Sequence, residues 1–385
     1  MKKILLASSA LVLVGGAAFA EVTLEGKASM GFIGGNTSTY DDDGVSFDGD
    51  SYGDDDARYS FVSDFDIVFN LSGETDGGVT FGASAEIDDL IGAPEFADEE
   101  DQGGESVFIS GDFGTITMGD TNGAYDFAVN EYINGQPGTI GDMEETAPYR
   151  GIALSANGVA LGLSDDDDED ATYASVDPLD DGLDGFYDGQ VARYDYTYGG
   201  FAIAVSAELS DETEGDPVLG LGATYNLEFT GGAVKFGAAY QTVSFDDYAT
   251  TTISTGDVLI RADGDISIAG VSAAMELDAG LSLDVAIANT MYDFDIEATD
   301  GANVASDNFD DDFMSYGVGI GYTFDAISVG AGYGFHDADT EIEGYSLTAA
   351  YDLGGGMALQ AGYGHSEIDD EADQDVYSFG VSMNF

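Results

Sequence analysis

Cysteine and tryptophan are absent from the 385 residues, and proline occurs only five times. Without cysteine the chain can form no disulfide and perform no thiolate chemistry. Without tryptophan, an aromatic belt at a membrane surface would have to be built from the 22 tyrosines and 23 phenylalanines. Few prolines beside 55 glycines favour many strands and tight turns over helices.

Basic residues are also scarce: 8 lysines and arginines stand against 76 acidic residues, a formal net charge of −68. This balance excludes nucleic-acid binding, which needs a basic surface. The acids cluster between segments of alternating apolar residues, which predicts acidic loops that stay hydrated and attract divalent cations. Disorder is a second reading of such a composition, but regularly spaced aromatics and 44% hydrophobic residues argue against it.

Long apolar runs are missing after residue 20, so any membrane crossing would have to use strands. Residues 1–20 are predicted to be a cleaved export signal. Lys2 and Lys3 form its basic region, Ile4–Val14 its apolar core and Ala18-Phe19-Ala20 its cleavage site. The apolar core is shorter than the roughly 20 residues of a membrane anchor. We therefore expect the mature chain to start at Glu21.

The last ten residues alternate between an apolar, aromatic face and a small polar face. This pattern is typical of a strand in an outer-membrane β-barrel, where one face meets lipid and the other meets water. The residues of the apolar face are Tyr377, Phe379, Val381, Met383 and Phe385.

The same pattern recurs along the chain and predicts an all-β fold, a transmembrane antiparallel up-and-down barrel. Sixteen strands are expected if a weak hairpin at residues 152–163 lies outside the wall, and eighteen if it belongs to the wall. Either even number lets the two chain ends pair and enclose a water-filled channel. The sixteen ranges are Val22–Gly34, Arg58–Leu71, Val79–Ile87, Glu105–Gly111, Thr115–Gly119, Val191–Tyr198, Phe201–Leu209, Val218–Leu227, Ala233–Phe245, Ile266–Leu277, Leu281–Phe294, Tyr316–Phe324, Ile327–Phe335, Tyr345–Leu353, Met357–His365 and Val376–Phe385.

Residues 120–148 interrupt this rhythm. The stretch Thr121–Tyr132 has no alternation and is predicted to contain a short helix. A loop of this length inside a compact domain is usually either functional or disordered.

Five motifs in a fixed order span the chain from residue 21 to its end. They are Glu21-Val-Thr-Leu-Glu-Gly26, Asp76-Gly-Gly-Val-Thr-Phe-Gly-Ala-Ser84, Phe113-Gly-Thr-Ile-Thr-Met-Gly-Asp-Thr-Asn-Gly-Ala124, Tyr351-Asp-Leu-Gly-Gly-Gly356 and the terminal Phe385. Together they resemble the general-diffusion porins of alphaproteobacteria such as Rhodobacter. The resemblance implies a homotrimer of sixteen-stranded barrels in the Gram-negative outer membrane, and passive passage of ions and small hydrophilic solutes. It also implies assembly by machinery that reads Phe385.

The resemblance further implies that residues 120–148 are a third loop folded into the lumen as a constriction. Its acidic side would come from Asp126, Glu131, Asp142, Glu144 and Glu145. The opposite wall departs from the family pattern, because Asp64 and Asp66 stand on the second strand where Rhodobacter-type members carry arginines. The inward-facing cations that alternation identifies are Arg58, Arg193 and Lys235, for which structural pairing with acids is as good a reading as selectivity. We therefore expect a mostly acidic, cation-favouring constriction.

Rival readings remain open on the sequence. No cofactor is required, but the aspartate runs at 41–43, 54–56 and 165–170 could bind calcium weakly. A secreted acidic calcium-binding β-protein, an adhesin or surface-layer component, would use such runs. A substrate-specific barrel would need a ladder of lumen aromatics, whereas the aromatics here mostly face outward.

Other motifs have no catalytic or nucleotide-binding reading. His365 and Ser366 are neighbours in a strand and point to opposite faces, so we expect no enzyme activity from them or from His336. The run Gly317-x-Gly-x-Gly321 is predicted to be a small-residue strand face rather than a nucleotide loop, because no helix follows it.

Overall fold

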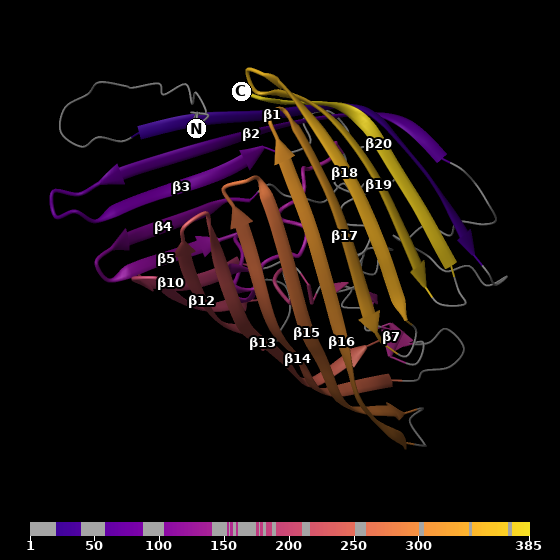
Figure 1. Cartoon of the computed structure of the whole chain (residues 1–385). Helices are drawn as coiled ribbons and strands as arrows, with labels where there is room; N and C mark the ends of the chain where they lie inside the picture. Colours follow the sequence, from indigo (N-terminus) through magenta and orange to yellow (C-terminus); the bar gives the residue numbers. More distant parts are fainter. Residues whose placement is uncertain are drawn as a thin grey trace.

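Sixteen antiparallel strands close into a barrel in the computed structural model (Figure 1). The structure describes residues 21–39, 58–87, 104–140, 152–153, 155–156, 159–160, 175–176, 178–179, 182–186, 190–209, 216–250, 259–299, 304–338, 341–368 and 372–385. The wall consists of β1 (Glu21–Thr39), β2 (Arg58–Glu74), β3 (Thr80–Ile87), β4 (Ser106–Gly111), β5 (Gly114–Gly119), β10 (Gln190–Tyr198), β11 (Phe201–Leu209), β12 (Val218–Phe229), β13 (Gly232–Thr250), β14 (Leu259–Leu277), β15 (Leu281–Thr299), β16 (Val304–Phe324), β17 (Ile327–Asp337), β18 (Ile342–Gly354), β19 (Met357–Ile368) and β20 (Ala372–Asn384).

Closure of the wall is made by β1 and β20, which pair from Lys27↔Asn384 to Thr39↔Ala372. At the other end of this seam, Phe385 donates its backbone N–H to the carbonyl of Gly26 at 2.8 Å. A closed ring leaves no strand edge with unpaired backbone groups. The predicted closure of the barrel is therefore confirmed.

The strand count is sixteen because the weak hairpin lies outside the wall. β7 (Ser155–Ala156) pairs only with β8 (Val159–Ala160). β6 (Ile152–Ala153) pairs instead with β9 (Ser175–Val176). The expected pairing of 152–155 with 159–163 is thus only partly right, and the eighteen-stranded alternative is wrong.

The outer face of the wall is apolar, with aromatic residues near both ends of the strands. Tyr198, Phe201 and Phe324 are exposed beside the short turns, and Phe61, Tyr316 and Phe379 are exposed toward the long-loop end. The outward residues of β20 include Tyr377 and Phe379, as predicted from the alternation, and Phe385 directly after the strand is exposed as well. Tyrosine and phenylalanine thus supply two belts of the kind found at membrane surfaces.

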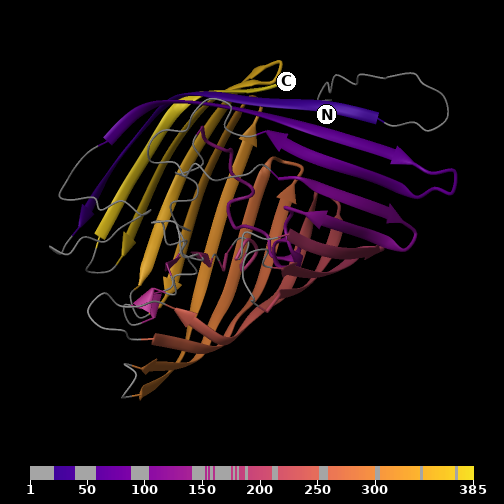
Figure 2. The ribbon, with the colours of Figure 1, turned by 180° about the vertical axis from the view of Figure 1, so that it is seen from behind.

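The wall is low on one side and tall on the other. β4 and β5 have six residues each, whereas β14, β15 and β16 have 19, 19 and 21. In both views the short strands lie together on one side of the barrel, and the long strands lie on the opposite side (Figure 1 and Figure 2). Among the described residues, no helix has the length and apolarity needed to cross a membrane.

A charged side chain in the middle of the lipid-facing surface should lower the free energy of unfolding of the barrel substantially. Ile320 is exposed on the outer face of β16 between Tyr316 and Tyr322. We expect Ile320→Lys to lower the free energy of unfolding by about 2–4 kcal/mol in lipid vesicles. Urea titration of the refolded barrel measures this.

The matched control is Ser84→Lys, on the inner face of β3. A lysine there remains in water, so we expect a change of about 0.5 kcal/mol or less. Equal costs for the two lysines would contradict the assignment of faces.

Candidate functional site

The loop after β5 enters the barrel and runs along its inner wall. It begins with the helix α1 (Ala124–Ala128), which packs against β11, β12, β13 and β14. The chain then passes β15–β18 and reaches β1 and β20, where the side chain of Ile140 lies against Gly31 and Gly380. The predicted short helix and the inward fold of the loop are both confirmed over residues 120–140.

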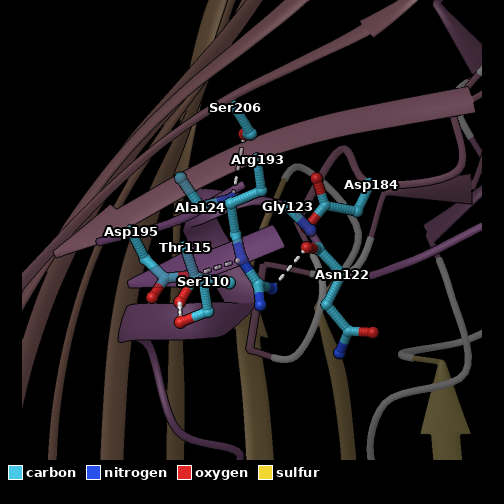
Figure 3. Close-up of polar contacts among 9 residues, drawn as sticks. All are labelled: Ser110, Thr115, Asn122, Gly123, Ala124, Asp184, Arg193, Asp195 and Ser206. Carbon is cyan, nitrogen blue, oxygen red and sulfur yellow. Dashed lines mark hydrogen bonds and ion pairs between the residues drawn. The ribbon is translucent and has the colours of Figure 1, made fainter. Parts of the chain in front are cut away.

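The start of α1 is held by acceptors from outside the helix. Gly123, its N-cap, has no side chain to satisfy the free N–H groups of the first turn. The Gly123 N–H instead donates to Asp184 Oδ2 at 2.7 Å, and the Ala124 N–H donates to Ser206 Oγ at 2.9 Å (Figure 3). The helix is thereby fixed both to the wall and to a second inner segment, residues 178–179 and 182–186.

Further along, small polar side chains of the wall hold the loop at regular intervals. Ser272 accepts the Asn130 N–H at 2.9 Å, and Ser282 donates to the carbonyl of Gly135 at 2.9 Å. At the far end, Ser29 donates to the carbonyl of Ile140 at 3.5 Å. These bonds fasten the loop backbone to the adjacent strands β14 and β15 and to β1.

Glycines on the inner face provide the space for this loop. Gly317, Gly319 and Gly321 lie on one face of β16 beneath Tyr132 and Gly135, and a Cβ at Gly319 would overlap the Tyr132 carbonyl. Close approach of two backbones requires residues without side chains. The predicted small-residue strand face is therefore the seat of the loop.

An apolar core lies inside the barrel between the loop and the tall strands, and the sequence analysis missed it. Tyr125, Val129 and Tyr132 of the loop pack with Leu183 of the second inner segment and with inward-facing residues of the wall. The sequence did carry a signal for this core, because the strands lose their alternation of apolar and polar residues where the inward-facing positions are apolar too. Those wall residues are Val218, Val243, Ile266, Ile268, Ala286, Ala288, Tyr292, Phe294 and Phe313.

Three predicted site residues meet at α1. Arg193 of β10 donates from Nη1 to the carbonyl of Asn122 at 2.6 Å, lies 3.6 Å from Asp195 and stacks 5.3 Å from the centre of the Phe127 ring. Lys235 of β13 donates to Asn130 Oδ1 at 2.5 Å. Asp126 lies within electrostatic reach of both cations. Both cations contact the loop, which agrees with a structural role for Arg193 and Lys235.

The pKa values of two carboxyl groups near α1 are raised. Burial raises the pKa of Asp126, and Lys235 and Arg193 only partly oppose that effect. Burial also raises the pKa of Asp184 to about 7, and the nearby carboxylates of Asp126 and Glu208 add to the rise. Hydrogen bonds from Gly123 and Gln241 act in the opposite direction.

Asp64 and Asp66 lie on the inner face of β2, near the end of the loop, because Val62 of the same strand packs against Ile140. They stand in register with Ser29 and Lys27 of β1. Lys27 is a lumen cation that the sequence analysis missed. Its place among Thr23, Glu25 and Ser29 on the polar face of the first strand was the available signal.

The remaining predicted site residues are less informative. Glu131 is half-buried in the loop. Arg58 begins β2, but its side chain is outside the described part of the structure, as are Asp142, Glu144, Glu145 and the aspartate runs at 41–43, 54–56 and 165–170. In the described portion of the chain, no group of three or more acidic or histidine residues is arranged to hold a metal ion.

The two histidines occupy structural positions. His336 Nδ1 lies 2.8 Å from Ser315 Oγ, and both residues are buried. His365 pairs with Asp375 at 2.9 Å on the outer side, whereas Ser366 is buried on the inner side. Neither serine is therefore placed as an accessible nucleophile beside a histidine.

Comparisons with known proteins agree with this architecture. A family model described as Gram-negative porin matches residues 7–371. A porin of Rhodobacter capsulatus is 27% identical over 373 residues, which are 95% of this chain and all of the relative. A porin structure refined at 1.8 Å superimposes with a TM-score of 0.59 at 23% identity, covering 95% of this chain and all of that one. An anion-selective porin from Comamonas acidovorans gives 0.57 at 15% identity with the same coverage.

Because Gly319 lies directly against the loop backbone, we expect Gly319→Ala to destabilise the packed loop. The new methyl group would overlap the backbone carbonyl of Tyr132, and such overpacking typically costs about 1–3 kcal/mol. Chymotrypsin, which cleaves after Tyr125, Phe127 and Tyr132, should cut the folded variant faster.

Gly26→Ala is the matched control, because its methyl group would meet nothing closer than 3.7 Å. It should be cut at the wild-type rate. Equal protection of the two variants would show that the loop does not use Gly319 as a seat.

Proposed function

Because the chain belongs to the Gram-negative porin family, we propose that it forms a water-filled channel across the outer membrane. Ions and small hydrophilic solutes diffuse through this channel passively, and no chemical step is catalysed. The observation that carries the proposal is the closed sixteen-stranded wall with a loop packed inside it. A wall of this size encloses space for water, and the inner loop narrows that space without filling it.

The channel favours cations under this proposal. Asp64 and Asp66 lie on the inner face of β2, while Arg193 and Lys235 are bonded to the loop. Rings of acidic side chains attract cations and repel anions. Since an anion-selective porin shares the fold, the inner charges rather than the barrel set the sign of the preference.

Other copies of the same chain cover the outer face of the short strands under this proposal. Six-residue strands such as β4 and β5 rise about 3.3 Å per residue and, tilted by about 40°, cover roughly 15 Å of the about 25 Å apolar band. Their outer residues Val107, Ile109, Ile116 and Met118 are nevertheless exposed and apolar. A ring of identical subunits would cover them, and the family resemblance supports a homotrimer.

Export and assembly complete the proposal. Residues 1–20 direct the chain out of the cytoplasm and are removed, so that the barrel domain of residues 21–385 remains. The barrel assembly machinery reads Phe385, whose ring is exposed at the seam. Calcium binds the acidic loops only loosely and is not required for transport.

The rival functions have less support. A closed barrel with an apolar outer belt does not suit a secreted adhesin or surface-layer protein. A substrate-specific barrel would need exposed aromatics along its lumen, but the inward-facing Tyr292, Phe294 and Phe313 are buried in the core beneath the loop.

Ion preference gives the direct test. The purified protein in a planar bilayer should open in groups of three steps, and a KCl gradient should give a reversal potential that favours K⁺. Asp64→Asn and Asp66→Asn should each move the reversal potential toward zero, because each removes a lumen charge. Asp310→Asn, on the outer face of β16, is the matched control and should leave it unchanged.

Channels with no cation preference would contradict the role of Asp64 and Asp66 but leave the channel function intact. A well-folded protein that never forms channels would contradict the proposed function itself.

The oligomer has a separate test. Ile109→Arg places a charge in the proposed contact between copies, so we expect the detergent-solubilised particle to fall from three chains to one by light scattering. Leu347→Arg, on the outer face of the 13-residue strand β18, should leave the trimer intact. A trimer that survives Ile109→Arg would place the contact elsewhere.

A further inference from the structure

The helix α1 is too short to hold its own position. It has five residues, and its cap Gly123 brings no side-chain hydrogen bond. Helices shorter than about 12 residues are marginal in water unless other parts of the protein hold them. Contacts from outside the helix therefore decide where α1 lies in the lumen.

The second inner segment supplies part of these contacts. Tyr125 of α1 donates its hydroxyl to the carbonyl of Pro178 at 2.7 Å, and Leu183 is buried with Tyr125 in the apolar core inside the barrel. Gly182 has a φ of +75°, and a Cβ there would lie 2.8 Å from the Tyr125 ring. A residue without a side chain thus lets the segment approach the helix closely. The position of α1 depends on this segment as well as on the wall.

Three hydrogen bonds in series join the second inner segment, the wall and the start of α1. The Leu183 N–H donates to Oε1 of Gln241, a buried residue of β13, at 2.8 Å. Gln241 Nε2 donates to Asp184 Oδ1 at 2.5 Å. The Gly123 N–H donates to Asp184 Oδ2 at 2.7 Å, at the start of α1 (Figure 3).

The directions of these three bonds are fixed by the backbone groups at their two ends. The N–H groups of Leu183 and Gly123 can only donate. Leu183 therefore takes the oxygen of the Gln241 amide, and the amide nitrogen is left to donate to Asp184. Asp184 then meets a donor on each of its oxygens. A carboxylate has an acceptor for both donors, whereas an asparagine amide would have an acceptor for one.

We propose that Asp184 and Gln241 are positioning residues of the channel: together they hold α1 against the wall and keep the width of the lumen constant. The inference rests on the proposed function, because α1 is part of the loop that narrows the lumen. It adds that the second inner segment, and not the wall alone, sets where that loop lies.

Both oxygens of Asp184 are acceptors when its carboxyl group is ionised. Burial, with the carboxylates of Asp126 and Glu208 nearby, raises the pKa of Asp184 to about 7, and the hydrogen bonds from Gly123 and Gln241 act in the opposite direction. Each test is therefore set at about pH 8.5, where the group is ionised.

Asp184→Asn tests the need for two acceptors. Its amide nitrogen would face a donor, either the Gly123 N–H or the Gln241 amide, and that donor would lose its acceptor. Because an unsatisfied buried donor favours opening of the loop, chymotrypsin should cleave after Tyr125 about tenfold faster. Asp278→Asn, in an exposed turn, is the matched control and should be cut at the rate of the unsubstituted chain.

Exchanging the two groups should restore the series of bonds. In the double variant Asp184→Asn/Gln241→Glu, the new carboxylate can accept from Leu183 and from the new amide, whose oxygen accepts the Gly123 N–H. The cleavage rate should return to within about twofold of the unsubstituted chain. Gln241→Glu alone should be cut faster, because two carboxylates would face each other. The proposal is overturned if the double variant is cut as fast as Asp184→Asn, or if Asp184→Asn is cut no faster than the unsubstituted chain.

Tyr125→Phe tests the hold of the second inner segment without changing Asp184. It removes one hydroxyl group and with it the hydrogen bond to the Pro178 carbonyl, and chymotrypsin still cleaves after the new side chain. This variant should fold even where the double variant does not, and it should be cut several-fold faster than the unsubstituted chain. Unchanged protection would show that the segment does not hold α1.

Single-channel recording tests the consequence for transport. Transitions between full and partial conductance should be about tenfold more frequent in Asp184→Asn than in the unsubstituted protein. In the double variant Asp184→Asn/Gln241→Glu they should be as rare as in the unsubstituted protein. Faster cleavage of Asp184→Asn with no change in these transitions would overturn the role of the two residues in the channel.

The two levels of inference fail separately. Loss and recovery of protection in a protein that forms no channels would contradict the proposed function and leave the hold on α1 intact. Channels whose loop protection does not respond to the exchange of the two groups would do the reverse.

Discussion

Backbone hydrogen bonding around a closed ring is the constraint on which the structure depends. In lipid no water is available to satisfy an open strand edge, so the first and last strands must pair. β1 and β20 do so over thirteen positions, and the Phe385 backbone extends the seam to Gly26. The apolar outer face and the polar lumen both follow from alternation along strands that the ring holds in register.

The ring also makes the inner loop possible. A loop can cross the inside of a barrel only where the wall leaves room for a second backbone, and here inward-facing glycines and serines provide that room. Glycine weakens a strand by itself, so Gly317, Gly319 and Gly321 in one strand would be a cost without the loop that packs on them. Wall and loop therefore stabilise each other.

Basic side chains are scarce on the inner face of the wall. Among the side chains that the structure describes, Lys27, Arg193 and Lys235 face the lumen, and the last two are bonded to the loop. Acids outnumber bases nearly tenfold in the chain. An anion-selective porin from Comamonas acidovorans has the same fold, so the fold alone does not set the sign of the inner charges.

The sequence by itself determined the wall. Alternation with period two is a local property, so the strands, their lipid-facing aromatics and the closing role of residues 376–385 could be predicted from it. The inward placement of the loop came from family resemblance. Tertiary structure decided what no local pattern contains: sixteen strands rather than eighteen, the apolar core around Tyr125 and Ile268, and the contact of Asp184 with Gly123 across 61 positions of sequence. The reason is physical. Alternation reports only which face a residue occupies, whereas packing depends on which distant segment the closed ring brings against that face.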